Sequence, residues 1–321
     1  MRALIVTENE AGQRLDKLLA KYMNLAGKSF LYKMMRKKNI TLNGKRCDGS
    51  EKLVRGDEVR LFLSDETIDK FSEVKLQEVK KVNLHIIYED EHILLVNKPS
   101  GMLSQKAKPG DESLVEYIID YLISSRQLST EQLKSFRPSV CNRLDRNTSG
   151  LIVAGKSLAG LQTMSAVFKD RSLHKYYRCV VNGLIKEKKV ITGFLKKDEK
   201  TNQVTVSSTE LPDSVPIMTE YEPLGYAEGY TYLSVLLITG RTHQIRAHLS
   251  SIGHPILGDY KYGDSAVNEE ARKRWRIQSQ MLHSYKLTFP ELQEPLAYLS
   301  GQTYFAPLPA AFSKICREWR E

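Results

Sequence analysis

The sequence has few cysteines and no long hydrophobic run. Its 321 residues include four scattered cysteines, Cys47, Cys141, Cys179 and Cys316, with no CxxC pair and no histidine at metal-ligand spacing. Neither a disulfide framework nor a structural zinc site is therefore expected. The apolar stretch from Tyr232 to Thr239 is far shorter than the roughly 20 residues that span a bilayer, and the N-terminus lacks a secretory cleavage pattern. We expect a cytoplasmic protein without a membrane helix.

Acidic residues are outnumbered, and the imbalance is concentrated in one part of the chain. The 38 Asp and Glu against 48 Lys and Arg give a formal charge of +10, and the block from Arg14 to Leu63 alone holds 13 basic and 5 acidic residues. Clustered Lys and Arg gain affinity for polyanions by releasing counterions from phosphates, so the block is a candidate nucleic-acid-binding module. A solvated charged face is the alternative from charge alone. The length and the 41% hydrophobic content suggest about two domains.

The basic block has a recognisable order of elements. Apolar residues recur at helical spacing from Leu15 to Tyr22, and a second helix is predicted over Phe30–Lys38 with a basic outer face. The Asn43-Gly44 turn then indicates a hairpin, and Val59–Leu63 alternates as a strand. With its RLDKLL, LNGK and GDEVRL segments, the block resembles the S4-like RNA-binding domain. The resemblance implies that RNA is bound by the basic residues Lys33, Arg36, Lys37, Lys38, Lys45 and Arg46.

We therefore divide the chain into an S4-like domain at 1–63, a polar linker at 64–83 and a large unit at 84–321. A short helix within 64–83 is the alternative to an irregular linker. In the large unit, strand-like runs outnumber helical ones and do not alternate strictly with them. Helices are predicted at 114–124, 157–169 and 243–251. This pattern predicts an α+β fold, with a mixed and mainly antiparallel sheet and peripheral helices, and it argues against a doubly wound fold.

Three polar clusters stand out in the large unit. In the first, Asp145 lies between Arg143 and Arg146, and nearby positive charge would hold its carboxylate ionised. The alternative is a turn aspartate whose side chain bonds the next amides. In the second, strand alternation places Tyr177 on one face of a strand and Tyr176 and Arg178 on the other. The Tyr177 ring is then either part of the core or a platform on which a nucleobase stacks.

The third cluster begins at Thr239-Gly240 and contains Arg246, which could pair with a carboxylate or a phosphate. The alternative is that the polar residues of this cluster only satisfy the free backbone groups at a helix N-terminus. His243 and His248 are five residues apart, and this spacing does not place two ligands on one helix face. No metal site is predicted.

Taken together, the three clusters resemble the RluA-type pseudouridine synthases. The family's HRLDxxTSGL appears as NRLDRNTSGL, its tyrosine segment as KYYRCVVNG, and its TGRTHQIRxHL and GHPIxGDxxYG segments are nearly intact. The resemblance implies that Asp145 is the catalytic aspartate, Tyr177 the active-site tyrosine and Arg246 the partner of the aspartate. Asn142 is the visible departure, because the family usually has His at that position.

The resemblance implies isomerisation of uridine in structured RNA, with ribosomal RNA of the large subunit as the first expectation and transfer RNA as the second. Asp145 would attack the sugar or the ring, or remove a ribose proton, while Tyr177 would stack on a flipped base. Arg143, Arg146 and Arg241 would touch the RNA. No cofactor is implied, and nothing demands more than a monomer. The rivals are a non-catalytic RNA-binding or ribosome-assembly factor, supported only by Asn142, and a sugar hydrolase, which would normally show two carboxylates.

Overall fold

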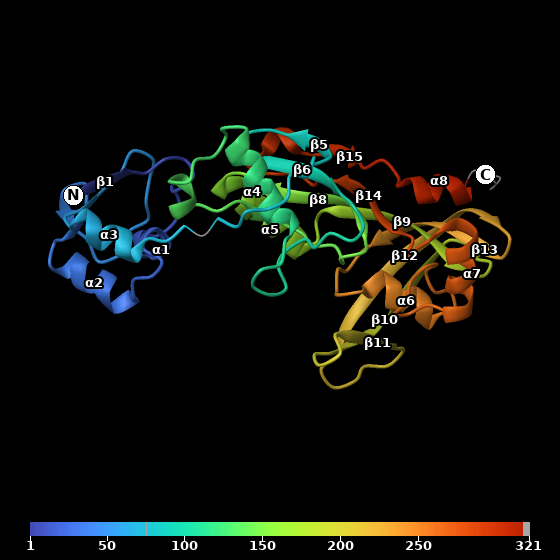
Figure 1. Cartoon of the computed structure of the whole chain (residues 1–321). Helices are drawn as coiled ribbons and strands as arrows, with labels where there is room; N and C mark the ends of the chain where they lie inside the picture. Colours follow the sequence, from blue (N-terminus) through green and yellow to red (C-terminus); the bar gives the residue numbers. More distant parts are fainter. Residues whose placement is uncertain (75, 317–321) are drawn as a thin grey trace.

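The structure is a computed structural model that describes residues 1–74 and 76–316, with the small N-terminal unit at one end of an elongated molecule (Figure 1). This unit contains a four-stranded sheet of order β1-β4-β2-β3, antiparallel at every described pairing, and three helices. Its elements are β1 (Arg2–Ile5), α1 (Leu15–Tyr22), α2 (Lys28–Arg36), β2 (Ile40–Leu42), β3 (Lys45–Arg46), β4 (Glu58–Leu61) and α3 (Asp65–Phe71).

The predicted hairpin and helices are present, with shifted boundaries. Asn43 and Gly44 have φ of 51° and 71° between β2 and β3, as a turn of the type favoured in hairpins requires. Helix α2 begins two residues before the predicted range, and its N-cap is Gly27. Helix α3 lies within the stretch predicted as a linker, and its Ile68 is fully buried in the core of the small unit. Such a short helix has too few apolar residues to produce a clear period.

The larger unit contains one eleven-stranded sheet. Its order is β11-β10-β12-β13-β9-β14-β8-β6-β5, with β7 beside β8 and β15 beside β14; within the described residues only β8 and β14 pair in parallel. The α+β prediction, with a mainly antiparallel sheet, is confirmed. The strands are β5 (Ile86–Glu89), β6 (Ile93–Lys98), β7 (Ser139–Val140), β8 (Ser149–Gly155), β9 (His174–Asn182), β10 (Lys189–Asp198), β11 (Gln203–Ser207), β12 (Val215–Ala227), β13 (Tyr230–Leu237), β14 (Leu282–Thr288) and β15 (Thr303–Phe305).

Helices cover both faces of the β6–β8 part of the sheet. Alternate residues of the two strands pack with α4 on one face and with α5 on the other, which explains why ILLV at 93–96 and LIVA at 151–154 are continuously apolar. Ser157 caps α5 by accepting a hydrogen bond from Gly160 N at 3.0 Å. The helices are α4 (Leu114–Ser124), α5 (Leu158–Asp170), α6 (Gln244–Ser251), α7 (Ser265–Trp275) and α8 (Ala310–Cys316), with 3₁₀ turns η1 (Gln132–Lys134) and η2 (Ala297–Leu299).

Polar contacts join the two units. Tyr22 Oη donates to Glu131 Oε1 at 3.1 Å, and Ser135 Oγ donates to Glu10 Oε1 at 2.6 Å. The longest helix in the described ranges, α5, has 13 residues, and none of the helices there is long and apolar enough to span a bilayer. Cys47 and Cys179 are buried free thiols. The side chain of Cys316 lies outside the described part of the chain.

Candidate active site

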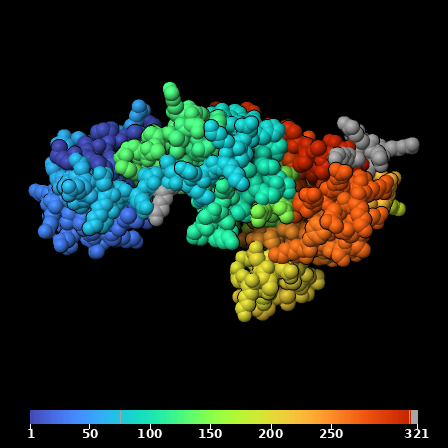
Figure 2. All heavy atoms as spheres, in the orientation of Figure 1, coloured from blue at the N-terminus to red at the C-terminus, as the bar shows by residue number. Residues whose placement is uncertain are grey.

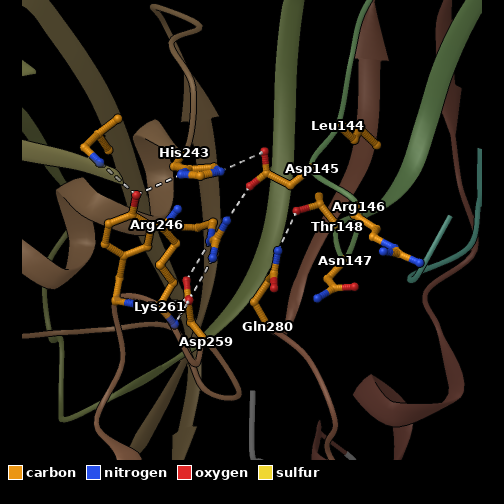
Figure 3. A network of polar contacts seen from close by, with 12 residues as sticks. Leu144, Asp145, Arg146, Asn147, Thr148, His243, Arg246, Asp259, Lys261 and Gln280 are labelled. Atoms are coloured by element: carbon orange, nitrogen blue, oxygen red, sulfur yellow. Dashed lines mark hydrogen bonds and ion pairs between the residues drawn. The ribbon is translucent and has the colours of Figure 1, made fainter. Parts of the chain in front are cut away.

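Asp145 lies in the loop between β7 and β8. Its backbone carbonyl accepts the turn hydrogen bond from Thr148 N at 3.0 Å, while its carboxylate points away from the turn toward Arg246 (Figure 3). The interpretation of Asp145 as a turn residue whose side chain bonds the next amides is therefore wrong. The carboxylate is 26% exposed, so it can meet both a protein partner and a ligand.

The segment after β6 holds this loop in place. Ser104 Oγ accepts from Leu144 N at 3.0 Å and donates to Leu144 O at 2.8 Å. The fully buried Lys98 donates from Nζ to Arg146 O at 3.1 Å, and also to the carbonyls of Pro99 at 2.9 Å and Met102 at 2.8 Å. Burial lowers the pKa of Lys98 to about 7, against the nearby charge of Asp145, which raises it. Lys98 thus connects the end of β6 to the Asp145 loop.

A glycine fixes the other end of the loop. Gly150, in β8, has a φ of 113° and pairs with Ser284 of β14 at the parallel junction of the sheet. A Cβ at this position would lie 2.2 Å from Ser284 O, so only glycine permits the close approach. Asn142 also anchors the loop, because its side chain accepts from Val153 N at 2.9 Å and donates to Leu151 O at 3.3 Å. An asparagine therefore suits the position at which the sequence departs from the family pattern.

Arg246, on α6, joins two carboxylates. Its Nη1 donates to Asp145 Oδ2 at 2.7 Å, while Nε and Nη2 donate to Asp259 Oδ2 and Oδ1 at 2.7 and 2.9 Å (Figure 3). Burial favours the neutral form of Asp259, but the paired guanidinium outweighs it and lowers the pKa of that carboxyl. Burial also opposes the charge of Arg246, and its two carboxylate partners raise its pKa despite this. Asp259 and Arg246 are therefore held in their charged forms by each other.

The arginines adjacent to Asp145 in sequence do not pair with it in the described residues. Arg143 and Arg146 are exposed, and Arg146 Nε donates to Gly101 O at 3.0 Å. The ionic partner of Asp145 is Arg246, which lies 101 residues away. The expectation that the flanking arginines hold the carboxylate ionised is thus corrected, because the contact to Asp145 comes from Arg246 of α6, while Arg146 bonds the Gly101 carbonyl.

Tyr177 lies on β9 with its side chain almost fully buried. Burial, together with the charge of Asp145, raises the pKa of its phenol, whereas Ser284 acts in the opposite direction. The hydroxyl is therefore protonated at neutral pH. Tyr177 and Asp145 line the same cavity, so the structure brings together the three predicted residues Asp145, Tyr177 and Arg246.

His243 was not selected from the sequence as a site residue, although it lies beside Asp145. It precedes α6 with φ of 52°, and its Nε2 lies 3.9 Å from Asp145 Oδ1. Its Nδ1 is 2.8 Å from the hydroxyl of Tyr262. Burial lowers the pKa of His243 and outweighs the attraction of Asp145, so the ring is neutral near pH 7. Asp259 was missed as well, and its place in the GHPILGD segment was the available signal.

The cavity around Asp145 has a volume of about 710 Å³ and a basic rim. The predicted RNA contacts Arg143, Arg146 and Arg241 line it, as do Lys106 and Lys197. Lys197 comes from the β10–β11 hairpin, which projects from the body of the molecule (Figures 1 and 2). The volume falls in the range of small-ligand pockets and could accommodate a nucleotide.

The small unit has a second basic surface. The six residues predicted to bind RNA there are exposed, and none of them has an ion-pair partner among the described residues: Lys33, Arg36, Lys37, Lys38, Lys45 and Arg46. By contrast, the arginines elsewhere in the unit are paired with carboxylates: Arg2, Arg14, Arg55 and Arg60. The unpaired group, which we call the basic face, is available to a polyanion.

Comparisons with known proteins show the family of the chain. A family model described as RNA pseudouridylate synthase matches residues 92–251. The ribosomal large subunit pseudouridine synthase C of Vibrio parahaemolyticus is 34% identical over 270 residues, which are 81% of this chain and 79% of that protein. Its Escherichia coli counterpart is 31% identical over 284 residues, 84% and 82% of the two chains. An uncharacterised RNA pseudouridine synthase of Mycoplasma genitalium is 30% identical over 292 residues, 90% and 89% of the chains.

Solved structures have the same fold. Human RNA pseudouridylate synthase domain containing 4 is similar with a TM-score of 0.56 and 20% identity, covering 74% of this chain and 94% of that one. Human RNA pseudouridylate synthase domain containing 1 has a TM-score of 0.50 and 22% identity, covering 75% and 98%. At these identities the likeness concerns the fold alone.

Proposed function

Because this chain belongs to the RNA pseudouridylate synthase family and is an enzyme that isomerises uridine in RNA, we propose that its substrate is ribosomal RNA of the large subunit and that Asp145 is its catalytic carboxylate. The observation that carries the assignment of Asp145 is its pairing with Arg246. Only one of the guanidinium donors faces Asp145, and the buried Asp259 holds the others. The carboxylate is thereby fixed in one orientation at the cavity while part of it stays accessible.

The isomerisation breaks the bond from ribose to the base nitrogen, turns the uracil, and rejoins a ring carbon to the same ribose. It needs an ionised carboxylate, either to attack the sugar or ring or to remove a ribose proton. Asp145 supplies this group, and Arg246 orients it. The double ion pair keeps Arg246 charged and directed throughout.

Tyr177 forms the wall against which the uracil packs. Its ring lines the cavity next to Asp145, and its hydroxyl is protonated because burial raises the pKa. An aromatic face is a suitable platform for any base, with about 1–3 kcal/mol per stacked base. The target base has to leave its helix to reach this wall, so the RNA is bound with the uridine flipped out.

Two basic surfaces hold the RNA around this point. Arg143, Arg146 and Arg241 at the rim of the cavity contact the backbone near the target nucleotide, and the basic face of the small unit contacts a more distant part. We assign the small unit to S4-like RNA-binding domains on the order of its helices and hairpin. Its unpaired cations favour contacts to phosphates over contacts to base edges.

The proposed substrate follows from the relatives, whose names specify the ribosomal large subunit. The test is to delete the gene in its host, map pseudouridines in ribosomal and transfer RNA, and restore either the wild type or Asp145→Asn. We expect defined sites in the large-subunit RNA to disappear and only the wild type to restore them. Asp145→Asn should bind the RNA within a few fold of the wild type, since the phosphate contacts are unchanged.

Other outcomes would overturn parts of this proposal. Loss of sites only in transfer RNA would refute the ribosomal substrate and keep the chemistry. Restoration of the sites by Asp145→Asn would refute the catalytic assignment. If no site changes and both versions rescue a growth defect, the protein acts in the host as an RNA-binding or assembly factor.

A further inference from the structure

We propose that Tyr262 is a positioning residue for the isomerisation, because it links the β10–β11 hairpin to Asp145 through His243. The proposal rests on Asp145 being the catalytic carboxylate. Tyr262 follows the loop that carries Asp259, and its side chain lies between the hairpin and the start of α6. It therefore contacts both an RNA-facing arm and the active site.

The contact with the hairpin runs through the Tyr262 hydroxyl and its neighbour. Val204 N, in β11, donates to Tyr262 Oη at 3.1 Å, and Lys261 Nζ donates to Asn202 O in the hairpin turn at 2.6 Å. The Tyr262 ring packs against a small apolar cluster at the base of the hairpin that includes Val204 and Ala247 of α6. The hairpin is thus attached at its inner end to the segment 261–262.

The same hydroxyl meets the active site. Tyr262 Oη lies 2.8 Å from His243 Nδ1, and His243 Nε2 lies 3.9 Å from Asp145 Oδ1 (Figure 3). Since the phenol oxygen already accepts from Val204, its own proton can be donated to Nδ1, and the ring then carries its proton on Nε2. In this arrangement the Tyr262 hydroxyl donates to Nδ1 of His243, and the Nε2–H of His243 points toward Oδ1 of Asp145.

The two oxygens of Asp145 are therefore oriented from two sides. Arg246 holds Oδ2 with a charged hydrogen bond, and His243 faces Oδ1 at a distance too long for a hydrogen bond. The Arg246 guanidinium also lies 5.0 Å from the Tyr262 ring centre. A displacement of the hairpin when RNA binds would move Val204, and through Tyr262 it would move His243 relative to Oδ1. This couples engagement of the arm to the orientation of the carboxylate.

The hairpin is suited to sense RNA because it lines the cavity. Lys197 of β10 and Asn202 of the turn belong to the lining that contains Asp145. Lys197 pairs with Val204 across the hairpin, so a contact to Lys197 acts directly on the residue that Tyr262 holds. A movement of Lys197 when RNA binds in the cavity would therefore reach His243 through Val204 and Tyr262.

The test compares Tyr262→Phe with the wild type in single-turnover pseudouridine formation on the same RNA. The phenylalanine ring keeps the packing and removes the hydroxyl that both Val204 and His243 use. We expect the single-turnover rate constant at saturating enzyme to fall about three- to tenfold, the range for one neutral hydrogen bond, with Kd for RNA unchanged within twofold. Hydrogen exchange at the Val204 amide should accelerate, because its acceptor is gone. Tyr260→Phe, at an exposed tyrosine two residues away, is the matched control and should leave both values unchanged.

A double variant tests whether the effect passes through His243. His243→Asn tolerates the left-handed backbone of this position and cannot reach Asp145. If Tyr262 acts through His243, adding Tyr262→Phe to His243→Asn should slow the reaction little further. Independent effects, with the two reductions multiplying, would refute the link.

The remaining outcomes separate this proposal from the assignment of Asp145. A wild-type rate for Tyr262→Phe, with Asp145→Asn inactive, would refute the link and leave the catalytic assignment intact. A raised Kd with an unchanged rate constant would make Tyr262 part of the RNA-binding surface and would also refute it. Turnover by Asp145→Asn would overturn the catalytic assignment first. A loss of active protein leaves the rate constant at saturating enzyme unchanged, so misfolding cannot imitate the expected fall.

Discussion

Replacement of Asp259 by asparagine is the most direct test of how the site is built. The side chain is fully buried and accepts two hydrogen bonds from Arg246 and one each from the amides of Lys261 and Tyr262, at 2.9 and 3.2 Å. The asparagine side chain would keep the volume and one carbonyl oxygen, but it would present N–H groups to a guanidinium that has no acceptor to offer. The change thus leaves a buried cation with only Asp145 as a charged partner.

The expected cost follows from this loss. Removing one partner of a buried ion pair destabilises a protein by about 3–5 kcal/mol, and the retained oxygen places this variant near 3 kcal/mol. At an unfolding entropy of about 2.1 cal/mol/K per residue, this corresponds for the 321-residue chain to a fall in Tm of about 4–5 °C. The guanidinium would also turn toward Asp145, and a displacement of about 1 Å at the proposed catalytic carboxylate costs about 100-fold in rate.

The assay is thermal unfolding together with single-turnover activity below the transition. Glu269→Gln is the matched control, since Glu269 and Arg272 make the same two-bond contact, both at 3.0 Å, on the exposed face of α7. Exposed pairs contribute little because water screens them, so its Tm should equal that of the wild type. Equal Tm values for Asp259→Asn and Glu269→Gln would refute the inference that burial makes the Arg246–Asp259 pair contribute more to stability than the exposed Arg272–Glu269 pair. A large fall in Tm with an unchanged rate constant would show that Asp259 stabilises the fold without orienting Asp145.

Three further predictions concern the surroundings of the site. Lys98→Met should lower both Tm and turnover, because it removes a donor from the carbonyls of Pro99, Met102 and Arg146, of which Arg146 O keeps the Gly101 amide. Calorimetry and the rate assay measure the two effects, and unchanged values would refute the role of Lys98 in supporting the loop. His283, buried and hydrogen-bonded to Ser149, has a pKa lowered to about 4 by burial, so stability present above pH 6.5 is lost as the pH falls toward 4, by up to about 3 kcal/mol. The Tm of His283→Gln should fall less than that of the wild type over this pH range. Parallel curves of Tm against pH for the two proteins would contradict the lowered pKa of His283. Joint replacement of Arg36, Lys37 and Lys38 by glutamine should make the dependence of log K for RNA on log salt shallower by about two to three, while an unchanged slope would exclude the basic face from binding.

Much of the sheet could be predicted from the sequence because its periods are strong. The continuous apolar runs in β6 and β8 indicate strands that are buried on both faces, and the helical period at 114–124 gives the bounds of α4. Helix α3 could not be placed from the sequence, because it contributes to the small core essentially through Ile68 and Phe71, too few apolar residues for a period. Local pattern fails where an element is short and its packing partners are distant.

The residues of the site likewise fall into those that sequence motifs predict and those that only the structure reveals. The motifs predicted Asp145, Tyr177 and Arg246, which the structure brings together at one cavity. The residues that support them depend on burial and on contacts far along the chain. Lys98 ends an apolar strand, and only the structure shows that its ammonium reaches three carbonyls of two loops. The charges adjacent to Asp145 in sequence suggested the wrong partners, since sequence proximity does not determine which side chains converge.

The chain of charges at the centre of the site explains why a second carboxylate is present. A buried arginine paired with one aspartate would be neutralised by it, and the aspartate would lose most of its reactivity to the ion pair. Asp259 instead takes two donors of Arg246, so that the buried pair is neutral by itself and Asp145 receives a single directed hydrogen bond. The side chain of Asp145 then keeps its exposure of 26% at the cavity. The arginine orients the carboxylate while leaving part of it accessible, which is what the catalytic role proposed for Asp145 requires.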